Sequence, residues 1–297
     1  MRNRTLLFIL CAMTMACGCR KKPQPIVITP DIQKNHLQRN HIFGAVKFIK
    51  TDTYYLGEDS IPLSDTSRID ELLQDKTASL SSVQRYTSDG YLLDYIKLKS
   101  PQDTMLRRIC RYNENAQATE WEEYDSTGIL SARGKYLYDR NRFLVGEQVF
   151  KGSSDSIAIA FAYSTDGGGN ITGSTQSLGD YSLHTTYKYN ENGQVCKITE
   201  HEPNGSVFKT VKIEYDNYGD EVNRCVYKSG NQMIEYTYNA YSQEGKLLKT
   251  IYENKMHKMK ETRLFDGYDS HLNWQQEIVV QDNRITSVRK RQIIYYQ

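Results

Sequence analysis

The fold is decided by a stretch that recurs along most of the chain, Tyr187-Lys188-Tyr189-Asn190-Glu191-Asn192-Gly193-Gln194-Val195. Its two tyrosines are spaced by two, which places both rings on one face of a β-strand. Asx at the first turn position and Gly at the fourth are typical of a type I turn, because the Asx side chain bonds the local backbone. The stretch therefore predicts a strand, a tight turn and a returning strand.

A tyrosine precedes each recurrence of the turn, most often 26 residues after the last one. The tyrosines that align in this way are Tyr86, Tyr112, Tyr138, Tyr163, Tyr189, Tyr215, Tyr238 and Tyr268. Second turn signals lie between them, for example at Pro203-Asn204-Gly205, so each period holds two strands of about 8–9 residues. Short turns at both ends of a strand make its neighbours antiparallel. We expect an all-β meander of hairpin repeats, in which the tyrosines serve mainly in strand packing.

The number of strands bears on the overall shape. Two strands per period give roughly 15 strands, and open sheets of that size curl or fold over. We expect a twisted or curled antiparallel sheet with one concave side, and a flat single-layer sheet is the alternative. The last run, residues 289–296, is predicted to be an exposed edge strand, because its Arg289, Lys290 and Arg291 discourage pairing with another chain.

Several turns resemble the YD repeats of Rhs-type proteins, notably Tyr124-Asp125-Ser126-Thr127-Gly128 and Tyr215-Asp216-Asn217-Tyr218-Gly219. Tyr268-Asp269-Ser270-His271-Leu272-Asn273-Trp274 resembles a unit of short YD-repeat lipoproteins of Gram-negative bacteria. The resemblance covers residues 83–297 and implies a fold rather than an activity. Long arrays in large Rhs-type relatives form a hollow shell, which this chain is expected to be too short to close. Ala116 and Leu272 stand where the repeat has glycine, so longer or differently shaped turns are expected there.

The N-terminal part of the chain divides into three segments before the repeats at 86–297. Residues 1–19 read as a lipoprotein signal peptide, since a basic start precedes an apolar run that ends at Cys17 and Cys19. A cysteine after a small residue there resembles a lipobox, and we expect lipid on Cys17 (or Cys19). Residues 20–41 read as an extended tether. Residues 42–85 are expected to cap the array, with strands over 45–50 and 53–56 and a short helix over 67–73.

Composition and motif searches point away from several classes of function. A formal net charge of +2 gives no indication of nucleic-acid binding. No spacing typical of a metal site, phosphate loop or nucleophile elbow appears, so we expect no metal, cofactor or catalytic residues. Three cysteines remain beyond the signal, Cys110, Cys196 and Cys225. They allow at most one internal bridge, most plausibly between Cys196 and Cys225, and the alternative is buried thiols.

The function expected from sequence is a non-enzymatic cell-envelope protein, anchored by its lipid in the outer membrane of a Gram-negative bacterium and facing the periplasm. Its sheet would bind a protein or glycan partner. Trp121 and Trp274 are the candidate binding aromatics, because aromatic side chains dominate such contacts. The alternative is an envelope hydrolase or processing factor whose site is built from loops.

Overall fold

The computed structural model describes residues 34–100 and 102–297. The predicted signal peptide, Cys17, Cys19 and the tether up to residue 33 lie outside the described residues. Among the residues described, no helix is both long enough and apolar enough to cross a membrane.

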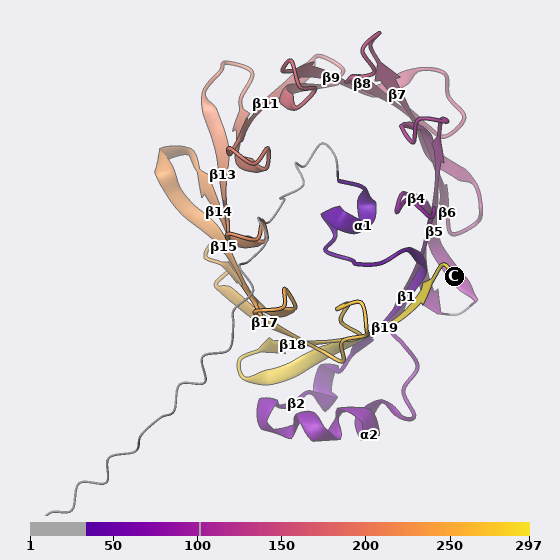
Figure 1. Ribbon diagram of the computed structural model, residues 1–297, viewed down its shortest axis with the longest axis vertical. Coiled ribbons are helices and arrows are strands. Elements are labelled where there is room, and N and C mark those ends of the chain that lie inside the picture. The colour runs from indigo at the N-terminus through magenta and orange to yellow at the C-terminus, as the bar shows by residue number, and fades with distance from the viewer. Residues whose placement is uncertain (1–33, 101) are drawn as a thin grey trace, which may run out of the picture.

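The chain folds into one antiparallel sheet in which consecutive strands are neighbours from the third strand onward (Figure 1). The strands of the first half are β1 Val46–Tyr55, β2 Ile61–Pro62, β3 Leu80–Tyr86, β4 Leu92–Ser100, β5 Asp103–Tyr112, β6 Ala118–Asp125, β7 Leu130–Tyr138, β8 Leu144–Lys151, β9 Ile157–Thr165 and β10 Ile171–Leu178. Those of the second half are β11 Tyr181–Tyr189, β12 Val195–His201, β13 Val207–Tyr215, β14 Glu221–Lys228, β15 Gln232–Tyr241, β16 Leu247–Asn254, β17 Met259–Asp266, β18 Gln276–Gln281 and β19 Arg284–Tyr295. The helices are α1 His36–Arg39, α2 Ile69–Leu73, η2 Gly57–Asp59, η3 Leu63–Arg68 and η4 Ser229–Asn231. The prediction of an all-β hairpin meander is confirmed.

The sheet closes on itself into a barrel of 18 strands, β1 and β3 to β19, so the predictions of an open curled sheet and of a flat sheet are both wrong. Closure is made by β1, which pairs with β3 on one side and with β19 on the other. Its contact with β19 runs from Val46 opposite Tyr295 to Tyr55 opposite Ser287. The predicted edge strand is therefore an interior strand. The region 42–85, predicted as a cap, supplies the two strands that complete the ring.

The outer side of the seam is covered by the short helices between β1 and β3. Ile69 and Leu73 of α2, which lies within the helix predicted over 67–73, are buried against Ile278, Val280 and Val288. Because side chains alternate along a strand, the neighbours of these residues on β18 and β19 point into the barrel. Figure 1 shows α2 outside the ring and α1 inside it.

Eight turns of one kind form one rim of the barrel, and they begin at Thr87, Asn113, Asp139, Asp166, Asn190, Asp216, Ser242 and Asp269. In the turn at Asn190, its backbone N–H donates to Gln194 O at 2.8 Å and Gly193 N–H donates to Asn190 O at 3.0 Å. The Asn190 side chain accepts from the N–H groups of Asn192 and Gln194, as its sequence predicts.

Two expectations about these turns need correction. The turns that hold Ala116 and Leu272 keep the common length and hydrogen bonds, because both residues adopt the positive φ that glycine has elsewhere, 57° and 68°. The tyrosine before the turn at Ser242 is Tyr241 rather than Tyr238. At the turn of Asp166 the equivalent position is Thr165, two residues after Tyr163.

Candidate functional site

The segment 34–45 crosses the inside of the barrel at this rim, and we call it the plug; the rim of eight turns is the plugged rim. One end of the plug bonds the first turn, where Leu37 N–H donates to Gly90 O and the Asn35 amide donates to Asp89 O at 2.7 Å. Further along, His41 Nδ1 lies 3.3 Å from Asp220 Oδ1, at a turn far around the ring. Phe43 then exchanges two 2.8 Å hydrogen bonds with the Asn273 side chain. The plug is thus attached to three separate turns.

Local sequence explains why this segment becomes ordered. Asn35 caps α1, and its side chain and that of Gln38 bond each other's backbone N–H in a capping box. Leu37 and Ile42 are buried with Ile49 and Tyr86 of the wall. The prediction of an extended tether is therefore wrong for residues 34–41. The spacing of Asn35 and Gln38 was the signal in the sequence that could have revealed the helix.

A cavity of about 710 Å³ lies between the plug and the wall. Its aromatic lining comes from Phe143 and from six tyrosines of the repeats, namely Tyr91, Tyr112, Tyr136, Tyr138, Tyr189 and Tyr215. Backbone and amide groups of the turns at Asn113 and Asp166 complete one side, through Gln117 and Asn170. A cavity of this size, with mixed aromatic and polar lining, fits a small-molecule site.

The tyrosines that end strands have a structural task that explains the repeat. The Tyr112 hydroxyl donates to the carbonyl of Leu92, the first residue of the preceding strand, at 2.7 Å. The same bond, at 2.8 to 3.1 Å, recurs from Tyr138, Tyr189, Tyr215 and Tyr241 to the carbonyls of Ala118, Ile171, Val195 and Glu221. Each of these bonds joins the end of one strand to the first residue of the strand before it. What such a tyrosine offers the cavity is therefore its ring, since its hydroxyl already donates a hydrogen bond.

The cavity lining is richer in cations than in carboxylates. Lys34, Arg39, Arg142 and Arg224 line it together with one acid, Glu221. Arg224 and Glu221 form a two-bond ion pair at 2.9 and 2.7 Å, whereas Arg142 donates to the neutral amide of Asn115 at 3.0 Å. A ligand with an anionic or hydroxyl-rich surface suits this balance.

His36 of the plug faces aromatic rings in the same cavity. Its ring centroid lies 6.1 Å from that of Tyr91 and 6.4 Å from that of Tyr112. Burial, and to a lesser degree the charge of Arg39, lowers the pKa of His36 below its ordinary value. The seated plug therefore favours a neutral imidazole.

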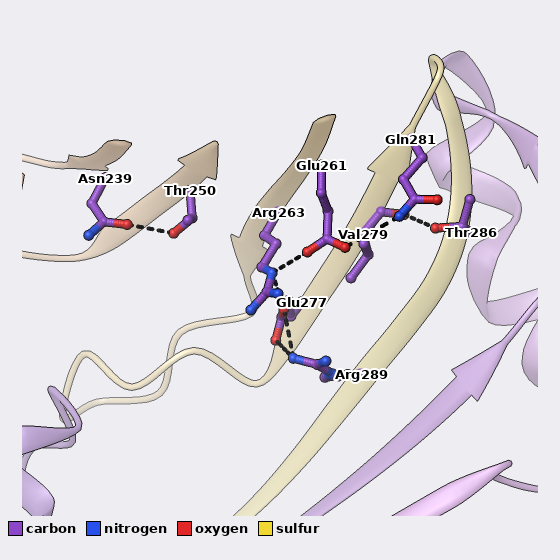
Figure 2. A network of polar contacts seen from close by, with 9 residues as sticks. All are labelled: Asn239, Thr250, Glu261, Arg263, Glu277, Val279, Gln281, Thr286 and Arg289. Carbon is purple, nitrogen blue, oxygen red and sulfur yellow. Dashed lines mark hydrogen bonds and ion pairs between the residues drawn. The ribbon is translucent and has the colours of Figure 1, made fainter. Parts of the chain in front are cut away.

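Elsewhere the inner wall carries carboxylates that are tied to cations. Figure 2 shows Arg263, Glu277 and Arg289 pointing toward one another from β17, β18 and β19. Glu277 is 2% exposed, and both its oxygens lie 3.0 Å from Arg289 Nη1. Likewise, Glu123 accepts from Arg108 at 2.7 Å. Glu277 and Glu123 are thus engaged by cations, whereas Glu147 accepts from the neutral groups of Trp121 and Tyr163.

The two tryptophans predicted as binding aromatics are both covered by arginines. Trp121 is 8% exposed, donates to Glu147 at 2.9 Å and lies under the Arg108 guanidinium, whose carbon is 4.6 Å from the ring centroid. Trp274 is half-buried, with the Arg291 guanidinium carbon 3.3 Å from its ring centroid. The structure brings neither indole into the cavity lining. Their role in binding stays a prediction.

The cysteines and the possible metal ligands were also subjects of the sequence predictions. Cys110, Cys196 and Cys225 are free thiols, so the predicted bridge between Cys196 and Cys225 is absent. Within residues 34–100 and 102–297, no group of three or more His, Cys, Asp or Glu side chains is arranged to hold a metal ion.

Comparisons with known proteins give structural likenesses only. No protein-family model matches the chain, and no curated protein matches its sequence. A crystal structure of a porin-like protein from Bacteroides uniformis is 9% identical with a TM-score of 0.44, and the match covers 85% of this chain and 98% of that one. The crystal structure of TcdB2-TccC3-Cdc42 is 10% identical with a TM-score of 0.34, over 73% of this chain and 14% of that one. The chain thus spans about a seventh of the length of that chain. Neither likeness assigns a function.

Proposed function

We propose that the chain is a non-enzymatic protein of the Gram-negative cell envelope that binds a glycan in the cavity between the plug and the wall. The observation that supports this is the cavity of about 710 Å³, whose lining combines phenol rings, amides and arginines. Sugars bind by stacking on aromatic rings while directed polar groups select their hydroxyls. The expected binding surface thereby moves from the sheet's face to the inside of the barrel.

The alternative, a hydrolase, finds less support in the same cavity. Glycoside hydrolysis generally requires two carboxyl groups that flank the scissile bond. Glu221 is the one acid among the described cavity residues, and both its oxygens accept from Arg224. Because the Arg224 guanidinium occupies both oxygens, neither is free to reach the oxygen of a leaving group.

Lipid anchoring remains part of the proposal and rests on the sequence around Cys17 and Cys19. The outer wall is consistent with a barrel that stays in water, because it bears charge pairs such as Arg107 with Asp94 and Arg111 with Glu122. A wall facing hydrocarbon would carry an apolar band instead. If the doubly substituted C17A/C19A chain still fractionates with membranes after a wash at high salt, which removes electrostatically bound protein, anchoring through these cysteines is wrong.

The glycan proposal is tested by calorimetric titration of the detergent-solubilised full chain with short neutral, amino and uronic-acid oligosaccharides. Arg140 and Arg142 are both exposed residues of one turn, but only Arg142 lines the cavity. We expect R142A to weaken binding about tenfold or more, because it removes a charged hydrogen-bond donor, and R140A to leave binding unchanged. Equal affinities for the two variants, or no binding by any sugar, would overturn the proposal.

A further inference from the structure

The outer wall pairs opposite charges across neighbouring strands over β3 to β7. Asp94 on β4 lies 3.6 Å from Arg85 on β3 and 3.2 Å from Arg107 on β5. Glu120 on β6 lies between Arg111 on β5, at 3.8 Å, and Lys135 on β7, at 3.7 Å. This is the usual arrangement, because opposite charges across a strand pair stabilise a sheet and like charges destabilise it.

The same side of β11, β12 and β13 breaks this pattern. Lys188 lies directly opposite Lys197, and Lys197 lies directly opposite Lys212. We call these three residues the lysine row. Within the described part of the chain, none of the three ammonium groups has a carboxylate within 4 Å, although Lys212 lies over the Tyr227 ring at 5.0 Å. Three cations side by side cost stability unless something outside the chain compensates their charge.

The lysine row faces away from the luminal cavity. Tyr189 and Arg224 line that cavity. Lys188 directly precedes Tyr189, and Lys212 is paired with Cys225, the residue after Arg224. Side chains alternate along strands, so the row projects from the outer surface. A ligand inside the barrel cannot neutralise it, and the compensating charge must approach from outside.

The surroundings of the row indicate what kind of partner fits. The next outward positions along the three strands are Thr186, Thr199 and Thr210, aligned in register. Thr186 and Thr210 supply hydroxyls, whereas Thr199 is buried. The other outward neighbour of Lys212 on β13 is Glu214, whose carboxylate accepts from the Asn223 amide, and the aromatic ring next to the row is that of Tyr227. Cores of protein interfaces are depleted in lysine, so a surface centred on three lysines is unlike one. Clustered lysines are instead typical of contact with anionic lipid headgroups.

We propose that the lysine row contacts the phosphate-bearing headgroups of a lipid bilayer, so that the barrel rests with the outer face of β11 to β13 on the membrane. Charge complementarity carries the assignment, and the barrel's convex outer face can approach a planar surface without obstruction. The inference is independent of what the luminal cavity binds.

The test measures vesicle co-sedimentation of the full chain carrying C17A and C19A, which removes the predicted lipid acceptors. Vesicles of phosphatidylcholine alone are compared with vesicles that contain phosphatidylglycerol. The test variant is K188Q/K197Q/K212Q. Its control, K99Q/K151Q/K255Q, removes the same charge from exposed lysines scattered over the other end of the barrel.

We expect binding to anionic vesicles that weakens with salt, is on the order of 100-fold weaker in the row variant, and is retained in the control. Circular dichroism of each variant establishes that it is folded. Absence of binding by the parent chain, equal binding to both vesicle types, or equal losses in the two variants would each overturn the proposal. The last result would show that net charge, rather than the row, drives association.

Discussion

Gly134 shows how closely single residues are fitted to the inner wall. It lies directly opposite Trp121 on the neighbouring strand. A Cβ atom at Gly134 would lie 2.2 Å from Trp121 Nε1, closer than packed atoms can approach. The absence of a side chain therefore lets the indole lie flat against the strand and reach Glu147.

We expect G134A to destabilise the protein by about 1–3 kcal/mol, because Trp121 must leave its place or the strands must separate. Its control is G173A, since Gly173 is also a strand glycine without positive φ, and an added Cβ there meets nothing closer than 3.6 Å. G173A is expected to be neutral or slightly stabilising. Urea unfolding followed by circular dichroism measures both, and equal midpoints would show that the Trp121 contact is unimportant.

Among the elements, the plug is the one whose placement depends on a few contacts. Gly90 has a φ of +82°, and a Cβ added there would lie 2.6 Å from the Asn35 amide nitrogen. Gly128 has nearly the same φ, +79°, in the same kind of turn, but nothing lies within 4 Å of its added Cβ. Substituting each glycine by alanine therefore separates the free-energy cost of the left-handed backbone conformation from the cost of displacing the plug.

We expect G90A and G128A to lower global stability by a similar amount, about 1 kcal/mol, because both force alanine into the left-handed region. Only G90A is expected to raise the hydrogen-exchange rates of Leu37 and Asn40, whose N–H groups are bonded within the plug and to the rim. Unchanged exchange in G90A would mean that the plug does not depend on its docking at this turn.

The seated plug is also expected to respond to pH through His36. Its pKa is lowered by burial, so the unseated plug binds more protons than the seated one. The contribution of neutral His36 to the docking of the plug is therefore complete above the ordinary pKa of 6.5 and is lost as pH falls below that value. Amide exchange over the plug should accelerate in that window, and H36Q should abolish the dependence. The rings of Tyr91 and Tyr112, and Arg39, surround the imidazole and supply no acid that would reverse this sign.

Sequence predicts the elements well where the signal is local. The pattern of Tyr189, Asn190 and Gly193 predicts a strand end and a turn within five residues, and the structure confirms both. Tyr241 was missed because Tyr238 also precedes Ser242 and Gly245, and Ser is a weaker turn signal than Asx. The plug was missed because contacts with distant turns order most of it, and the capping box of Asn35 and Gln38 is its one local signal.

At the scale of the whole molecule, local sequence patterns do not predict that the sheet closes into a barrel. Closure depends on whether the first strand reaches the last one after the twist of all the others has accumulated. β1 ends in Tyr54 and Tyr55 but is not followed by the Asx-to-Gly turn that marks the repeats, and nothing in it predicts a partner about 240 residues away in the chain, such as Gln292 opposite Lys50. A ring of 18 strands is too wide for its side chains to fill, which leaves room for the plug and the cavity.

Closure also predicts how the protein unfolds. In an open array, units at the ends unravel before the middle, because each unit contacts only its neighbours. Here every long strand has two partners, so no strand is at an end. The chain has two tryptophans, Trp121 on β6 and Trp274 between β17 and β18, which report on separate parts of the ring. W274F and W121F each leave one of them.

We expect the fluorescence midpoint in urea of each single-tryptophan variant to coincide with the midpoint of the same variant by far-UV circular dichroism. Comparing two probes within one variant removes the difference in stability that the substitutions themselves cause. If the indole near β18 reports a transition at lower urea than the circular dichroism, the seam between β1 and β19 opens first. The barrel would then behave as an open array whose ends happen to meet, and the closing strand pair would contribute little to its cooperativity.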